Sequence, residues 1–233
     1  MPRSRGFTLI EVLVVISLLV LLISILSPSL SQGRRNARMA VCISGLHQFG
    51  IAWTSYVDES MGVLMGASTN RLKYDWVYTN APTESEIHLK TGTMYPYVRD
   101  PRLYRCPDDP RPDYLRSYSM SNFLGGLPGW GIAPAVKQHQ LHKQDQTMML
   151  IEEPDPRGFN QGSWVIHPKG SPSADSWIDW AGNFHNNGTT ISYADCHAEY
   201  LGWRDPRTPA IQWFYAVTPD NPDLVRLQQA YTP

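Results

Sequence analysis

The 233-residue chain has few cysteines and almost no net charge. None of its three cysteines belongs to a Cys-x-x-Cys pair, so their spacing gives no support for a structural zinc site. The formal net charge is −1, and 61–233 holds no basic cluster that would suggest nucleic-acid binding. No Asp-x-Asp-x-Asp-Gly loop is present, so we expect acidic residues such as Asp108 and Asp109 to be solvated. The sequence therefore predicts no cofactor and no metal.

A long apolar run near the amino terminus is the most informative feature that is present. Residues 7–27 carry one charge, Glu11, and as a helix they can span roughly 30 Å of hydrocarbon. A carboxylate at the centre of such a helix raises the free energy of membrane insertion by roughly 2.5–3.5 kcal/mol unless a specific partner compensates its charge. The basic stub 1–6 is too short for a domain and is typical of a processing leader. A secretory signal would have a shorter apolar region with a small-residue cleavage site, and a plain anchor would not explain Glu11.

The segment Gly6-Phe7-Thr8-Leu9-Ile10-Glu11 with its apolar continuation resembles the class III signal of the type IV pilin and pseudopilin superfamily. The resemblance implies that a prepilin peptidase cuts between Gly6 and Phe7 and methylates the new terminal amine. It also implies that the Glu11 carboxylate pairs with the Phe7 terminal amine of a neighbouring subunit during assembly. Both charges would be costly in hydrocarbon until they paired, so assembly would satisfy both. The implied location is the bacterial inner membrane, crossed once, with the remainder in the periplasm or exterior.

The helix is expected to continue beyond the membrane as an amphipathic half over 28–60, with a kink at Pro28. Apolar and small residues recur there at intervals of three and four: Ala37, Ala40, Val41, Ser44, Leu46, Phe49, Ala52, Trp53 and Tyr56. An independent core helix after a linker stays open as the alternative. The remaining 61–233 is rich in proline and tryptophan and is expected to be one exported, β-rich domain.

Strands are predicted at 76–78, 147–151 and 163–166. The best hairpin joins 189–193 to 198–201 through Asp195-Cys196 as a two-residue turn, with Tyr193 facing Ala198 and Ile191 facing Tyr200. The predicted fold class is therefore α+β, in which a long helix packs on a small antiparallel sheet with long loops.

A second resemblance covers the hairpin region. His185, nine residues and then Asp195 are similar to the H-X9-D-G signature of a pilin-like family described as processing-associated, and further similarity lies at 41–46, 103–110 and 116–120. Cys196 replaces the glycine of that signature, so either the turn type differs or the chain tolerates about 1 kcal/mol of strain. The resemblance names a family and no reaction.

The same family implies a disulfide between Cys42 and Cys106, which would leave Cys196 free, and an exported domain permits such a bond. Three reduced cysteines remain the alternative.

We interpret the chain as a non-enzymatic, prepilin-like subunit of a type IV pilus or type II secretion pseudopilus, and as a minor subunit. Its expected partners are the prepilin peptidase, other pilin or pseudopilin subunits and the inner membrane. One rival is a membrane-anchored surface-binding module for carbohydrate. That rival would use some of the tryptophans at 130, 164, 177, 180, 203 and 213. The other rival is an anchored metalloprotein or hydrolase centred on His185 and Asp195.

Overall fold

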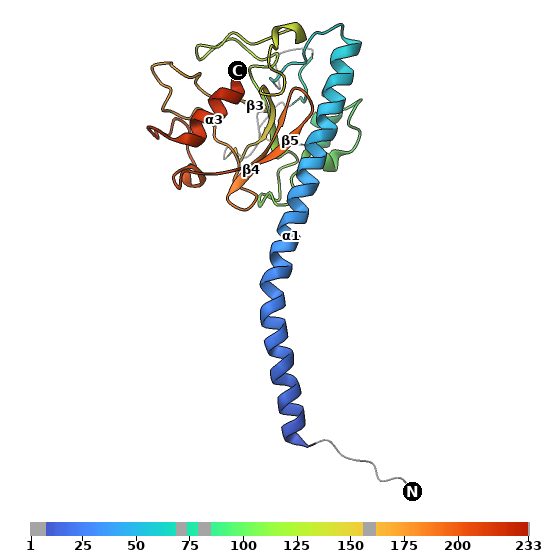
Figure 1. Cartoon of the computed structure of the whole chain (residues 1–233). Helices are drawn as coiled ribbons and strands as arrows, with labels where there is room; N and C mark the ends of the chain where they lie inside the picture. Colours follow the sequence, from blue (N-terminus) through green and yellow to red (C-terminus); the bar gives the residue numbers. More distant parts are fainter. Residues whose placement is uncertain (1–7, 69–73, 79–84, 156–161, 233) are drawn as a thin grey trace. The chain divides into compact units, whose positions relative to one another are not determined.

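The computed structural model describes residues 8–68, 74–78, 85–155 and 162–232. It divides into two compact units, 1–38 and 39–233, each of which is described by itself. Helix α1 (Leu9–Glu59) is a single element of 51 residues that continues through Pro28 (Figure 1). Residues 39–59 of α1 belong to the second unit, which also contains every strand that the structure describes.

The second unit is built on a five-stranded sheet with the order β3-β1-β2-β4-β5. The strands are β1 (Tyr118–Ser121), β2 (Met148–Glu152), β3 (Ser163–Trp164), β4 (Gly188–Tyr193) and β5 (Ala198–Gly202). The pairs β1–β2, β2–β4 and β4–β5 are antiparallel, but β1 and β3 run parallel. The α+β prediction is confirmed, while the expectation of a purely antiparallel sheet is wrong at this one edge.

Some of the strand predictions are confirmed and others are wrong. The segments predicted at 147–151 and 163–166 correspond to β2 and to the short β3, and β1 was not predicted. The strand predicted at 76–78 is wrong. Trp76 and Val77 form a buried bend, in which the Trp76 indole N–H donates to the Gly162 carbonyl at 2.8 Å, and Tyr78 is exposed. A short apolar run signals burial, and it does not distinguish a strand from a buried loop.

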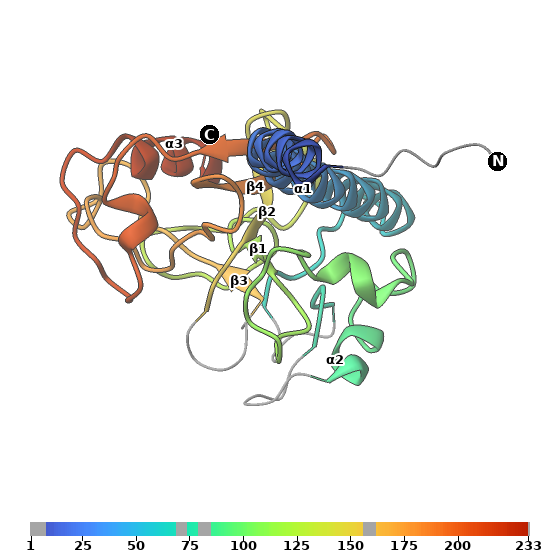
Figure 2. The same ribbon diagram turned by 90° about the horizontal axis from the view of Figure 1, so that it is seen from below.

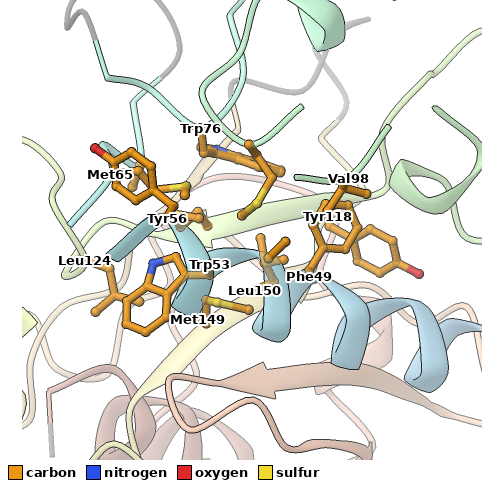
Figure 3. Packing of buried hydrophobic residues seen from close by; sticks show 14 of the residues in the cluster. Phe49, Trp53, Tyr56, Met65, Trp76, Val98, Tyr118, Leu124, Met149 and Leu150 are labelled. Atoms are coloured by element: carbon orange, nitrogen blue, oxygen red, sulfur yellow. The ribbon is translucent and has the colours of Figure 1, made fainter. Parts of the chain in front are cut away.

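Each face of the sheet is covered by a helix. Adjacent strand residues point to opposite faces, and Leu150 packs in one buried cluster whereas Ile151 packs in another. The Leu150 cluster contains Phe49 and Trp53 of α1, which lie against β2 in Figure 3. The Ile151 cluster contains residues of α3 (Pro222–Tyr231) and several tryptophans. Figure 2 views α1, α3 and the strands from below.

Helix α3 was not predicted, although its start carries a strong local signal. Asn221 is the N-cap, and its side-chain oxygen accepts from the backbone N–H groups of Asp223 and Leu224, while Pro222 occupies the first turn. The shorter elements are α2 (Glu86–Lys90), η1 (Pro101–Tyr104), η2 (Gln138–Gln140) and η3 (Thr208–Ala210).

The β4–β5 hairpin is present, but its register differs from the prediction by one residue. Ile191 pairs with Glu199 and Thr190 with Tyr200, so Ile191 does not face Tyr200. The backbone N–H of Tyr193 donates to the carbonyl of His197, which leaves a three-residue loop at 194–196. Such a loop needs a residue with positive φ at its end, and Cys196 adopts φ 78° there. The extra loop residue shifts the pairing of β4 with β5 by one residue from the predicted register.

The amphipathic half of α1 buries nearly the expected face. Leu46, Phe49, Ala52, Trp53 and Tyr56 are buried as predicted. Four of the predicted positions are exposed instead: Ala37, Ala40, Val41 and Ser44. Their places are taken by Cys42 and Gly45, both of which are buried.

Candidate functional site

The first described turn of α1 is closed by Thr8 and Glu11. The Glu11 carboxylate oxygen Oε2 accepts from the Thr8 backbone N–H at 2.9 Å and from the Thr8 hydroxyl at 2.8 Å. In return, the Glu11 backbone N–H donates to the Thr8 hydroxyl oxygen at 3.3 Å. This reciprocal pair is a capping box, which satisfies the orphan donors at a helix start. Glu11 therefore has a local role in addition to the one implied by resemblance.

Among the described residues of the first unit, nothing covers the apolar segment of α1. All large apolar side chains from Leu9 to Leu30 are exposed, and Leu9 is 92% exposed. The hydroxyls of Ser17 and Ser24 donate back to the carbonyls of Val14 and Leu21, so they need no water. This is a surface suited to lipid or to neighbouring helices. Among the described residues, α1 is the one helix that could cross a membrane by its length and composition.

A buried cluster of four side chains is the most unusual group in the second unit. We call Cys42, Cys106, Glu152 and His185 the Cys-Glu-His cluster; one sulfur, nitrogen or oxygen atom from each lies within 4.8 Å of the others. Cys42 Sγ and His185 Nε2 both lie 3.1 Å from Cys106 Sγ, and Glu152 Oε1 lies 3.1 Å from His185 Nε2. Four separate segments supply these residues: α1, the loop after η1, the end of β2 and the loop before β4.

The cluster is strongly polar although it is buried. Hydrogen bonding with the Cys106 thiol lowers the pKa of Cys42 to about 6, and the same contact, with burial, raises the pKa of Cys106. Burial alone would lower the pKa of His185, but its contacts with Cys42 and Glu152 outweigh burial and raise this pKa to about 10. The shifted pKa values favour the charged forms of Cys42 and His185 although both side chains are buried.

Neighbouring residues hold the cluster in place. Asp108 Oδ2 lies 3.1 Å from His185 Nδ1, and the Asp108 backbone N–H donates to Cys106 Sγ at 3.4 Å. The adjacent Asp109 accepts from the Arg111 guanidinium and from the Ser117 hydroxyl. The expectation that Asp108 and Asp109 are solvated is wrong. Asp109 is buried because Arg111 and Ser117 satisfy it, and the Asp108 side chain is only 12% exposed because it packs against His185.

The two cysteines that were predicted to form a disulfide are brought together. Their sulfurs are 3.1 Å apart and unbonded, compared with about 2.05 Å in a disulfide. The disulfide therefore stays a prediction.

The two residues of the H-X9-D pattern take separate places. His185 lies in the cluster, whereas Asp195 lies in the hairpin loop and pairs with His197 at 2.6 Å. His197 also stacks on Tyr193, with ring centroids 4.1 Å apart, and Cys196 Sγ contacts the Thr54 hydroxyl at 3.1 Å. His185 and Asp195 thus have different partners and do not form one site.

The tryptophans considered for a carbohydrate surface lie mostly in the core. Trp164, Trp177, Trp180 and Trp203 are buried, and only Trp130 and Trp213 of this set are exposed. Anchoring of the core and loops therefore accounts for most of them.

Comparison with known proteins adds one finding, and it concerns the amino terminus. Residues 1–27 match the family described as the prokaryotic N-terminal methylation motif. No curated protein and no solved structure matches the chain. The methylation motif covers Gly6, Phe7 and Glu11, and it supports a prepilin-like substrate of prepilin peptidase. Gly6 and Phe7 lie outside the described residues, so cleavage between them stays a prediction.

The sequence analysis identifies three members of the cluster, and one family resemblance implies both the Cys42–Cys106 pair and the pattern that begins at His185. It does not place His185 beside the two cysteines, and Glu152 is not among its candidate residues. The only signal for Glu152 is its place directly after the apolar run 147–151. The four residues lie far apart in the chain, so no spacing could have revealed the group.

Proposed function

We propose that the chain is a membrane-anchored, prepilin-like subunit that a prepilin peptidase processes at Gly6-Phe7 and that assembles through α1 into a pilus or pseudopilus, as a minor subunit. The methylation motif over residues 1–27 carries this proposal, because it is joined to a helix of 51 residues. The exposed apolar length of α1 supports it, since such a surface needs lipid or other helices around it. The globular unit would then be a structural or recognition surface in the periplasm or exterior.

Glu11 is the residue on which assembly would depend. Removal of the leader would create a charged amine at Phe7, four residues before the Glu11 carboxylate. Near hydrocarbon, both charges favour pairing over isolation. Glu11 already closes its own helix with Thr8, so its charge and its capping role have to be tested separately.

The substitution Glu11→Gln separates these roles, because glutamine also serves in a capping box but carries no charge. We expect incorporation into filaments to fall more than about tenfold, since an unpaired charge in the membrane costs roughly 2.5–3.5 kcal/mol. The measurement is the amount of the variant in sheared or crosslinked filaments, relative to its amount in the membrane fraction.

Thr8→Ala is the matched control, because it removes the hydroxyl of the capping box and leaves the charge of Glu11. We expect Thr8→Ala to assemble close to the wild-type level. Wild-type incorporation of Glu11→Gln would contradict the proposed role of the charge. Absence of the wild-type protein itself from filaments would instead favour an anchored surface-binding module, which needs the helix for attachment alone.

A further inference from the structure

The Cys-Glu-His cluster holds the side chains that a transition metal prefers. Two thiolates, an imidazole nitrogen and a carboxylate oxygen form a ligand set suited to tetrahedral Zn²⁺. All four residues are at most 3% exposed, and their ligand atoms lie within 4.8 Å of one another. From this convergence we propose that Cys42, Cys106, Glu152 and His185 bind one zinc ion.

The distances fit such an ion with small movements. At Zn–S distances of about 2.3 Å, two sulfurs of a tetrahedron are about 3.8 Å apart. Cys42 Sγ and Cys106 Sγ are 3.1 Å apart and would have to separate by less than about 1 Å. The 3.1 Å between His185 Nε2 and Glu152 Oε1 is already close to the roughly 3.3 Å expected between nitrogen and oxygen ligands.

The hydrogen bonds around the cluster leave the ligand atoms facing one another. Asp108 can only accept, so His185 Nδ1 carries the proton between them, and Nε2 is the nitrogen available to a metal. Glu152 Oε2 accepts from the Thr190 backbone N–H at 2.9 Å and from the Thr189 hydroxyl at 3.1 Å. This arrangement turns Glu152 Oε1 toward His185, where it is buried without a well-aligned hydrogen bond.

A metal accounts for the whole group better than a disulfide does. A bond between Cys42 and Cys106 would use two of the four residues and would leave the buried Glu152 oxygen without a cation other than an imidazolium. Zinc would instead replace the protons on the thiols and on His185 Nε2, so that every ligand atom shares one partner.

The site would be structural in character. Four protein ligands complete the coordination of zinc, whereas catalytic zinc sites keep one position open for water or substrate. The ligands come from α1, the loop after η1, β2 and the loop before β4, so the ion would join the helix to the sheet. The zinc would therefore contribute to the folding stability of the second unit.

Metal analysis of the full-length protein in detergent tests the proposal. After removal of loosely bound metal, we expect one zinc per wild-type chain by elemental mass spectrometry, and its loss in Cys106→Ser. Cys196→Ser is the matched control, because Cys196 lies outside the cluster and should keep the full zinc content. Cobalt substitution of the wild type should also give thiolate-to-metal charge-transfer bands.

Asp108→Asn covers the case in which Cys106→Ser does not fold. Asp108 contacts the ligand His185 without contributing a ligand atom, and we expect its substitution to weaken zinc affinity by about 10- to 100-fold. Zinc retention by Cys106→Ser, or an intact mass showing a Cys42–Cys106 disulfide in place of metal, would overturn the proposal. So would a failure of the reduced wild-type protein to take up zinc or cobalt.

Discussion

At the scale of single residues, Cys196 combines a backbone conformation that favours glycine with side-chain and backbone contacts to α1. Its φ of 78° lies in the region that glycine adopts at no steric cost. Its carbonyl oxygen lies 2.7 Å from His47 Nδ1, and its sulfur contacts Thr54, so the residue also docks the hairpin on α1. The close approach requires glycine on the helix side, because a Cβ at Gly50 would lie 2.6 Å from Cys196 Cα.

We predict that Cys196→Gly leaves the free energy of unfolding unchanged or raises it by up to about 1 kcal/mol, because relief of the positive φ offsets the lost sulfur contact. Cys196→Val should lower it by about 2 kcal/mol, since a β-branched side chain tolerates this conformation poorly. Chemical denaturation of both variants measures the difference. Equal stability of the glycine and valine variants would show that the backbone is not strained there.

At the scale of elements, residues 39–59 of α1 are held in the second unit by the buried face of the helix. Phe49 packs edge-on against Tyr104, with ring centroids 4.9 Å apart, and lies beside Tyr118 of β1. Two residues further on, Ile51 is 52% exposed. The helix therefore offers a buried and an exposed apolar residue within one turn.

Phe49→Ala should lower the free energy of unfolding by about 3–5 kcal/mol, because it leaves a cavity between α1 and the sheet. Ile51→Ala should change it by less than about 0.5 kcal/mol, as for other exposed positions. The comparison can be made by urea denaturation monitored through tryptophan fluorescence. Similar losses in the two variants would show that the buried face of the helix has been assigned incorrectly.

At the scale of the whole molecule, the methylation motif over residues 1–27 and the exposed apolar residues of α1 are consistent with membrane anchoring. The proposed assembly through Phe7 and Glu11 would require processing first, because it needs a mature amino terminus.

Co-expression with an active prepilin peptidase should yield a chain that begins at N-methylated Phe7. Intact mass and amino-terminal peptide mapping detect this product, and expression without the peptidase supplies the control. A chain that still carries residues 1–6 beside an active peptidase would leave a signal-anchored exported domain, whose role would then lie in the second unit.

The sequence by itself determined the features of the amino-terminal helix. Hydropathy and helix length depend on residues close together in the chain, so local patterns suffice to predict them. The Thr8–Glu11 cap is equally local, but the sequence analysis did not predict it. The α+β class and the β4–β5 hairpin were also predictable, because their periodicity is local.

Only the tertiary structure decided the rest. The hairpin register depended on one extra loop residue, and the parallel pairing of β1 with β3 joins segments about forty residues apart. The Cys-Glu-His cluster required four distant segments to meet, and Glu152 became notable only when the fold buried its carboxylate beside His185. Such groups are positioned by long-range packing, which the spacing of residues along one chain does not encode.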